Sequence, residues 1–280
     1  MMKKSVITIF TTALILWFSA CTETIINEND QPGRLVVKVT DAPFPVSFVD
    51  SAKVTITKIE IRKVCDTICD GNPYSVIMED TVTFNLLELR NGVVEELLDI
   101  EIPQGKYDLI RLYVQEASLM IKDRPEPFNV KVPSGQQTGI KIFIKPGIEI
   151  DGGLTSELLL DFDLTRSFIM QGNLNRPSGI KGFIFKPVIR AVNVSTAGRI
   201  EGIVSDTAKA KIANASVWIK QDTVISTAIT DSLGHYAILG VPAGTYSVFA
   251  TKENYDTVSY EGIKILTGNK TIRDFVLTKK

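Results

Sequence analysis

Apolar and polar residues alternate along most of this chain, and this two-residue period is the feature that most limits its fold. In the first such segment Leu35, Val37 and Val39 share one face, while Lys38 and Thr40 lie on the other. Successive side chains of a β-strand point to opposite faces, so the pattern predicts strands with one face in a core. Glycine, proline and Asn-Gly turn signals separate the segments. We therefore predict an all-β protein of two β-sandwich domains in tandem.

Residues 34–194 are predicted to form the first sandwich. In the strand expected at 52–64, the inward positions change from even to odd numbers after Ile56. This change of phase predicts a β-bulge near Thr57-Lys58. The helix-like segment 85–90 is at most two turns long and ends at a strong turn signal. Further strands are predicted at 74–84, 107–121, 127–132, 139–145, 156–162 and 182–194.

Residues 199–280 are predicted to form a second, smaller sandwich after a linker at 195–198. The apolar segments here are short and evenly spaced, which is typical of a sandwich of about seven strands. These strands are predicted at 199–205, 214–220, 223–230, 234–239, 245–252, 257–266 and 271–277.

One turn pattern occurs once in each predicted domain. Proline is followed by glycine two residues later and by tyrosine four residues later, at Pro103 to Tyr107 and at Pro242 to Tyr246. Proline fixes the turn entry and glycine supplies a positive φ. We expect each tyrosine to be buried and its hydroxyl to bond nearby backbone, which would hold the corner together.

A set of motifs spread over nearly all of residues 34–194 resembles the domain of unknown function 4382, a family of bacterial lipoprotein domains. The resemblance implies a fold and a location in the cell envelope, but no activity. The motifs are Thr40-Asp41-Ala42-Pro43, Phe84-Asn85-Leu86-Leu87-Glu88-Leu89, Ile102-Pro103-Gln104-Gly105-Lys106-Tyr107, Val132-Pro133-Ser134-Gly135, Leu160-Asp161-Phe162-Asp163 and Lys186-Pro187-Val188-Ile189.

The second domain resembles the carboxypeptidase regulatory-like domain, a transthyretin-like sandwich of the immunoglobulin-like or prealbumin-like kind. Such modules are appended to many exported proteins, where they stiffen, space or bind carbohydrate, and they have no peptidase chemistry. The motifs are Gly198-Arg199-Ile200-Glu201-Gly202-Ile203-Val204, Asn214-Ala215-Ser216-Val217, Thr230-Asp231-Ser232-Leu233-Gly234-His235-Tyr236 and Gly240-Val241-Pro242-Ala243-Gly244-Thr245-Tyr246.

Residues 1–20 are predicted to be a lipoprotein signal peptide. Two lysines precede an apolar run of thirteen residues, 6–18, which is shorter than the roughly 20 residues of a membrane span. The sequence Phe18-Ser19-Ala20-Cys21 then resembles a lipobox. It implies cleavage before Cys21 and acylation of that residue. An ordinary secretory signal that carries a cysteine is the alternative.

The segment after the cleavage site is predicted to be a flexible tether, residues 21–33. Thr22 and the acidic residues of the tether resemble Bacteroidetes-type outer-membrane lipoproteins, periplasmic or surface-exposed. Removal of residues 1–20 takes away two lysines and no acid, which leaves 29 basic and 32 acidic residues, a net charge of 29 − 32 = −3. With no basic stripe in the sequence, nucleic acid is not an expected partner.

The other two cysteines, Cys65 and Cys69, enclose a predicted turn. In an oxidising compartment, a disulfide across this turn is our first choice. A metal site is the weaker alternative, because His235 is the only histidine and lies far away in sequence.

Two acidic residues, Asp161 and Asp163, share one face of a predicted strand. With Asp41, Glu149 or Asp151 they are weak candidates for an oxygen-rich calcium site. The alternative is that they bond neighbouring loops. No assembled pattern of catalytic residues accompanies them, and His235 is expected to be a surface turn residue, so we predict a protein that is not an enzyme and needs no cofactor.

Trp218 is predicted to point away from the second core, because Val217 and Ile219 take the inward phase. An exposed indole can stack on a sugar ring. The alternatives are packing against the first domain, or covering an outer-face neighbour such as Tyr255 or Tyr260.

Asp followed by Ser or Thr occurs seven times near predicted turns and resembles an O-glycosylation sequon of exported Bacteroidetes proteins. The alternative is that Asp simply favours turns. The acceptor residues would be Ser51, Thr67, Thr81, Thr207, Thr223, Ser232 and Thr257.

Together these features predict a non-catalytic cell-envelope lipoprotein that contacts the membrane through Cys21 and has a carbohydrate-binding role. The alternative is a structural or adhesin-like surface component that acts through β-sheet edges.

Overall fold

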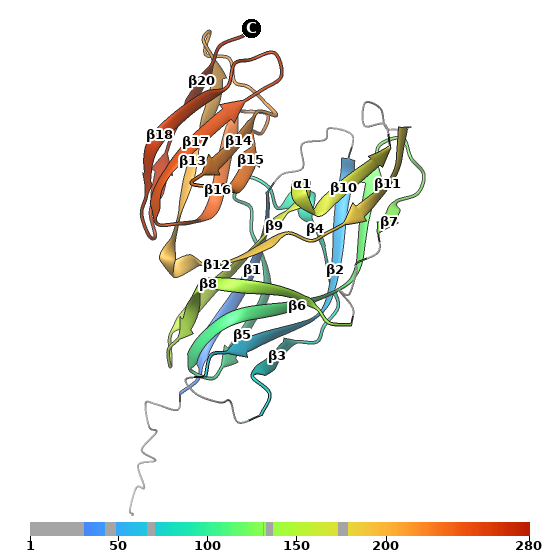
Figure 1. Cartoon of the computed structure of the whole chain (residues 1–280), viewed down its shortest axis with the longest axis vertical. Coiled ribbons are helices and arrows are strands. Elements are labelled where there is room, and N and C mark those ends of the chain that lie inside the picture. Colours follow the sequence, from blue (N-terminus) through green and yellow to red (C-terminus); the bar gives the residue numbers. More distant parts are fainter. Residues whose placement is uncertain (1–30, 43–48, 66–70, 131, 133–136, 173–178) are drawn as a thin grey trace, which may run out of the picture.

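The chain folds as two β-sandwiches in tandem, and the all-β prediction is confirmed (Figure 1). The computed structural model describes residues 31–42, 49–65, 71–130, 132, 137–172 and 179–280. The strands of the first domain are β1 (Gly33–Ala42), β2 (Val49–Lys63), β3 (Tyr74–Met78), β4 (Val82–Asn85), β5 (Glu95–Ile102), β6 (Gly105–Ile121), β7 (Phe128–Val130), β8 (Ile140–Ile150), β9 (Thr155–Asp163), β10 (Phe168–Gly172), β11 (Ile180–Phe185) and β12 (Ile189–Asn193).

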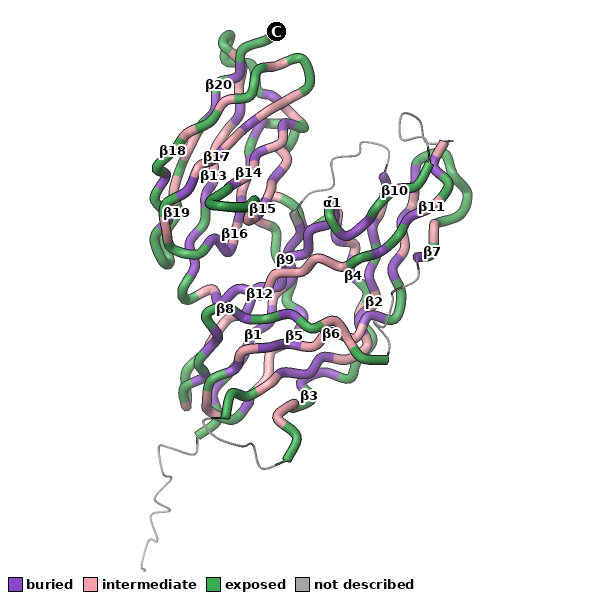
Figure 2. The backbone as a smooth tube through the Cα atoms, viewed as in Figure 1, coloured by how far each residue is buried: buried purple, intermediate pink, exposed green. Residues whose placement is uncertain are grey.

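Ten of these strands form a single sheet that curves around the first core. Its main path is β3-β2-β6-β8-β12-β9-β1-β5, and β4 and β7 pair with β2 and β6. The inward residues of β1, Leu35, Val37 and Val39, are completely buried, as their alternation predicts. Figure 2 shows a similar alternation along much of β8, whereas β9 is buried without interruption from Leu158 to Asp163. The pairing of β2 with β6 shifts register between Ile56 and Lys58, which confirms the predicted bulge.

The structure adds β5, a strand that the sequence analysis did not predict. The pairing of β5 with β1 shifts register between Val37 and Lys38, and this bulge buries both Leu97 and Leu98. Two adjacent buried residues interrupt the two-residue period. The acidic residues of β5 are tolerated because the strand lies at the end of the sheet.

Two predicted strands of the first domain are each divided in the structure, as is the predicted strand 271–277 of the second domain, which forms β19 (Lys270–Ile272) and β20 (Phe275–Leu277). The segment 74–84 forms β3 and β4, and 182–194 forms β11 and β12. The second break follows from Pro187, which has no N–H for a ladder; the N–H of Val188 donates instead to Oγ of Ser167 at 2.8 Å. Ser167 ends the short helix α1 (Leu164–Ser167), which precedes β10 and was not predicted. The helix-like segment 85–90 contains the short 3-10 helix η2 (Leu86–Glu88).

The second domain packs two four-stranded sheets face to face. Their orders are β16-β13-β19, with β20 also paired to β13, and β15-β14-β17-β18. Val217, Ile219 and Val248 of one sheet and Ile200 of the other are completely buried between them. The strands are β13 (Ala197–Asp206), β14 (Ser216–Lys220), β15 (Val224–Ile229), β16 (His235–Pro242), β17 (Gly244–Thr251), β18 (Val258–Ile265), β19 (Lys270–Ile272) and β20 (Phe275–Leu277).

The two predicted tyrosine corners are both present. The hydroxyl of Tyr107 donates to the carbonyl of Pro103 at 2.8 Å, and that of Tyr246 donates to the carbonyl of Pro242 at 2.8 Å. Both rings are buried, and burial raises the pKa of each phenol. In each corner, a hydrogen bond therefore spans the turn and fixes the start of the strand that follows it.

Within the described ranges, no helix is long and apolar enough to span a bilayer.

Candidate functional site at the domain boundary

The second domain packs on the outer face of the β9 and β12 part of the large sheet. The connection is the short 3-10 helix η4 (Val194–Thr196), which leads from β12 directly into β13. Leu159 of β9, Val192 of β12 and Ala197 of β13 form a small apolar cluster at this boundary, with Leu239 of β16 against it. These apolar contacts hold the domains together over and above their covalent connection.

A close backbone approach completes the apolar contact. Gly240 has a φ of +60°, and a Cβ there would lie 3.2 Å from Cδ2 of Leu159 and 3.4 Å from Cβ of Val192. Both the positive φ and the short separation favour glycine at this position.

Beside the apolar cluster lies a polar network centred on Arg190 of β12. Its Nη2 donates to Oδ2 of Asp161 at 2.6 Å, and its Nη1 donates to the carbonyl of Gly240 at 2.6 Å. Nη2 also lies 3.3 Å from the carbonyl of Leu239. The hydroxyl of Ser226, in β15, donates to the same Asp161 oxygen at 3.3 Å. One arginine of the first domain therefore binds a carboxylate of its own domain and the edge of a strand of the second.

Burial dominates the electrostatics of this network. The Asp161 side chain is 8% exposed and that of Arg190 is 25% exposed. Burial raises the pKa of Asp161, and the adjacent Arg190 guanidinium opposes this by favouring the carboxylate. The pair therefore resembles a buried salt bridge. Removing one partner of such a bridge destabilises the protein, because the other charge is left buried and uncompensated.

The structure gives the other acidic candidates separate roles. Asp163 caps α1: its Oδ1 accepts the N–H of Arg166 at 2.9 Å, and its Oδ2 pairs with Nε of the same residue at 2.6 Å. Glu149 and Asp151 are exposed and lie at the end of β8 and just beyond it. Within the described ranges, no three His, Cys, Asp or Glu side chains are grouped so as to hold a metal ion.

Asp41 is the unusual carboxylate of this region. It is buried on the core face of β1, and neither carboxylate oxygen has a hydrogen-bond partner in the structure. Burial raises the pKa of Asp41 well above its usual range, the negative charges of Asp161 and Asp163 add to this, and the N–H of Leu164 only partly offsets it. Folding therefore favours the protonated form of Asp41 relative to an exposed aspartate.

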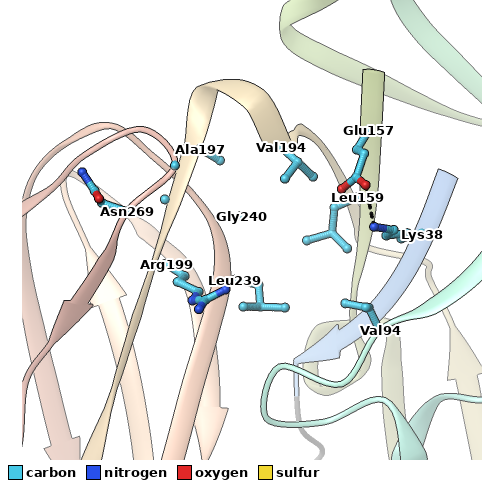
Figure 3. Close-up of a pocket in the computed structure, with 12 residues that line it drawn as sticks. Lys38, Val94, Glu157, Leu159, Val194, Ala197, Arg199, Leu239, Gly240 and Asn269 are labelled. Carbon is cyan, nitrogen blue, oxygen red and sulfur yellow. Dashed lines mark hydrogen bonds and ion pairs between the residues drawn. The ribbon is translucent and has the colours of Figure 1, made fainter. Parts of the chain in front are cut away.

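A small hollow opens next to the apolar cluster, between the two domains. Its volume is about 200 Å³. Figure 3 shows Leu159 and Val94 of the first domain facing Leu239 of the second across it, with Lys38 paired to Glu157 on one side. The Lys38–Glu157 distance is 2.7 Å. The hollow thus has apolar walls and a charged rim.

Trp218 lies on the outer face of the second sandwich, as predicted from its phase. The indole stacks on Phe249, its direct neighbour on β17, with ring centroids 5.2 Å apart and an angle of 5° between the rings. Trp218 itself is half-buried. Phe249, which the sequence analysis did not name, covers part of the indole and leaves the rest of the pair on the outer face.

The remaining predicted residues do not converge on a common site. His235 is exposed, and its backbone N–H donates to Asp231. Cys65, which follows β2, is disulfide-bonded, while Cys69 and the predicted lipidation residue Cys21 lie outside the described residues. The pairing of Cys65 with Cys69 therefore stays a prediction.

The glycosylation candidates also stay predictions, although their placement differs. Ser51 is half-buried at the start of β2, and Thr67 lies outside the described residues. The hydroxyl of Thr257 donates to that of Thr251 at 3.0 Å. The exposed acceptors are Thr81, Thr207, Thr223, Ser232 and Thr257.

Arg190 was missed by the sequence analysis, although a signal for it exists. It stands inside the apolar segment Val188 to Val192, where a charged residue is unusual unless it is paired. The run Leu158-Leu159-Leu160 is a second signal, because three consecutive apolar residues indicate a strand that is buried on both faces.

Comparison with protein families gives two matches. The family model described as "Domain of unknown function (DUF4382)" matches residues 32–187, more than half of the chain. The model of the carboxypeptidase regulatory-like domain matches residues 199–278. No curated protein matches the chain.

Solved structures are similar only at a low level. A type II cohesin–X-dockerin chain from Acetivibrio cellulolyticus is 20% identical over 29% of this chain and 56% of its own, with a TM-score of 0.24. The shaft pilin SpaA of Lactobacillus rhamnosus GG is 11% identical over 89% of this chain and 98% of its own, with a TM-score of 0.26. This chain spans between 56% and 59% of the first three solved chains. At these scores the likenesses carry no argument.

Proposed function

We propose that this chain, which belongs to the DUF4382 family and carries a carboxypeptidase regulatory-like domain behind it, is a non-catalytic lipoprotein of the cell envelope that binds carbohydrate. Neither family description names a catalytic activity. Of the acidic side chains that the sequence offered as site residues, Asp161 and Asp163 have structural partners, Glu149 and Asp151 stand apart, and Asp41 is buried on the core face of β1. This placement supports a binding role over a catalytic one.

The stacked pair of Trp218 and Phe249 carries the carbohydrate part of the proposal. Two parallel aromatic rings on the outer face of a sheet present edges and part of one face to a ligand. Sugar rings offer C–H groups that pack against such aromatic surfaces.

Trp218 also provides the assay. Trp17 lies in the predicted signal peptide, so Trp218 is the only tryptophan in residues 22–280. We expect defined glycans to change its fluorescence, and we expect Trp218→Leu to lose binding on a glycan array. Phe143→Leu is the matched control, because Phe143 is a 55% exposed aromatic residue of the first domain. Equal glycan binding by both variants would exclude the pair as a carbohydrate site.

The anchor has its own test. Cys21→Ser should release the protein from the outer-membrane fraction, and protease treatment of whole cells should distinguish a periplasmic from a surface location. Retention of the Cys21→Ser protein in that fraction would contradict acylation at this residue. Several buried acyl chains are needed for stable anchoring, so loss of the cysteine should have a large effect.

A second proposal is a structural or adhesin-like role through sheet edges, favoured by the end positions of β5 and β18 in their sheets. Edge strands can add a strand from another chain. Reversible self-association at high salt that is abolished by a proline in the middle of β5 would favour this role over carbohydrate binding.

A further inference from the structure

The domain boundary is hollowed at three places that share residues. The small apolar hollow shares Val94, Arg199 and Leu239 with a second hollow of about 640 Å³. The second shares Asn91 and Asp231 with a third of about 730 Å³. The three are therefore contiguous, and we call them together the boundary groove.

One sheet of the second domain provides the floor of this groove. Arg199 and Glu201 of β13 and Ala237 and Leu239 of β16 line it, and Glu201 pairs in register with Ala237. The neighbouring residues on these strands face the core. The segment around Val94 of the first domain forms the opposite wall (Figure 3).

The small hollow at one end of the groove accepts an apolar group. Val94, Leu159 and Leu239 line it, and Val94 is 41% exposed. Its volume of about 200 Å³ is below the roughly 300–1,000 Å³ of small-molecule sites, which makes it the size of a single large side chain.

The second hollow is acidic. Its lining includes the carboxylates of Glu201, Asp231 and Asp274 and one cation, Arg199, which pairs with Glu201 at 2.9 Å. Lys270, outside the lining, lies 3.3 Å from the same Glu201 carboxylate, so three carboxylates face two cations. Backbone N–H groups fix Asp274 and Asp231: Ile203 donates to the former at 2.8 Å, and Leu233 to the latter at 2.8 Å. Carboxylates in excess of cations favour a basic group in the ligand.

We propose that the boundary groove binds an extended peptide segment of a partner protein, with one large apolar side chain in the small hollow and a basic side chain over the carboxylates. The spacing follows from β16. Ala237 and His235 are two and four residues from Leu239, or about 7 and about 13 Å at the rise of a strand. The basic residue of the peptide therefore lies two to four residues from the apolar one.

The lining of these two hollows disfavours carbohydrate here. Tyr236 is the only Phe, Tyr or Trp among the residues that line them; it is 2% exposed, and its hydroxyl donates to the carbonyl of Arg273 at 2.6 Å. The only exposed ring in the lining is the imidazole of His235, so the groove offers a sugar no open phenyl, phenol or indole face, unlike Trp218.

The test uses residues 22–280, which contain every described strand, and acetylated pentapeptides with a fluorescent label at the C-terminus. The probe has the sequence Leu-Gly-Lys-Gly-Lys; one comparison peptide replaces lysine with glutamate and another replaces leucine with glycine. We expect fluorescence anisotropy to show that the probe binds about tenfold more tightly than either comparison peptide. A tenfold difference in Kd corresponds to about 1.4 kcal/mol, the free energy of a few weak contacts.

Variants assign the binding to the groove. Val94→Asp should weaken the probe about tenfold, whereas the matched control Val76→Asp should not, because Val76 is a 50% exposed valine of β3. Glu201→Gln should bring the affinities of the lysine and glutamate peptides close together, and it stands as the test if Val94→Asp does not fold. Equal binding of all three peptides, equal effects of the two valine variants, or an oligosaccharide that displaces the probe would each overturn the proposal. These outcomes are independent of Trp218.

Discussion

Arg190→Met is the substitution that most directly tests how the two domains are held together. Methionine keeps the apolar stem of the arginine but removes its charge and its three hydrogen bonds to Asp161, Gly240 and Leu239. The Asp161 carboxylate, 8% exposed, then keeps only the weak bond from Ser226. Removing one partner of a buried ion pair costs about 3–5 kcal/mol, and we expect about 3 kcal/mol here because Arg190 is partly exposed.

The pH dependence of this loss separates the charge from the packing. Burial raises the folded-state pKa of Asp161, and removal of the arginine raises it further. A carboxyl whose folded pKa exceeds its unfolded value of about 3.9 destabilises the protein increasingly as the pH rises between those two values. The deficit of Arg190→Met should therefore be smallest near pH 4 and reach its full size above the folded pKa of Asp161.

Urea denaturation followed by circular dichroism, at several pH values, measures the free energy of unfolding. The double variant Arg190→Met/Asp161→Asn is the control, because a neutral amide at position 161 does not need the cation. It should recover more than half of the loss, and limited proteolysis should cut the 194–197 connection faster in the single variant only. A loss below about 1 kcal/mol, or a loss of constant size at every pH, would refute the buried-pair reasoning.

Three further predictions concern the fold. Tyr107→Phe and Tyr246→Phe should each cost about 1 kcal/mol in urea denaturation, the value of one hydrogen bond; no loss in either would mean that the hydroxyls do not hold the corners. In the wild type, the free energy of unfolding should fall by up to about 1.4 kcal/mol per pH unit as the pH rises from the ordinary to the raised pKa of Asp41. Asp41→Asn should remove this fall when unfolding is measured at several pH values. Identical pH profiles for the two proteins would contradict an unpartnered carboxyl. Gly240→Ala should cost about 1–2 kcal/mol and loosen the domain contact at Leu159; a thermal midpoint equal to that of the wild type would contradict the close approach.

The sequence predicted local features well wherever one physical pattern determined them. The phase of β14 places Val217 and Ile219 in the core and Trp218 outside, as alternation requires. The bulge after Ile56 and the hydroxyl contact of Tyr107 also follow from their own local residues. These features depend on contacts within one strand pair or one turn.

The domain boundary could not be predicted in the same way. Alternation tells which face of a strand is apolar, but it does not tell which element covers a second apolar face. Leu159 and Val192 lie on the outer face of the large sheet and are covered by a domain whose position depends on the turn at η4. The bonds of Arg190 to β16 and the role of Gly240 arise only from that placement, since these partners are about 50 to 80 residues away in sequence.

The same docking determines which strand edges remain available for an edge-acting role. β15 and β16 end their sheets on the side that meets the first domain, where Ser226 contacts Asp161 and Arg190 binds two carbonyls of β16. At the opposite end, β18 is interrupted by a bulge at Glu261-Gly262, where glycine has a φ of +70°. Bulges and covered edges both hinder the addition of a strand.

Of the two end strands of the ten-stranded sheet, β3 and β5, the longer is β5. It lies at the end of the ten-stranded sheet and carries Glu95, Glu96, Asp99 and Glu101. Like charges directly opposite each other destabilise a strand pair, so a second copy of β5 would be a poor partner in antiparallel register. An edge-acting role of this protein would therefore select a basic strand from a different protein, and self-association through β5 should appear only at high salt, where the repulsion is screened.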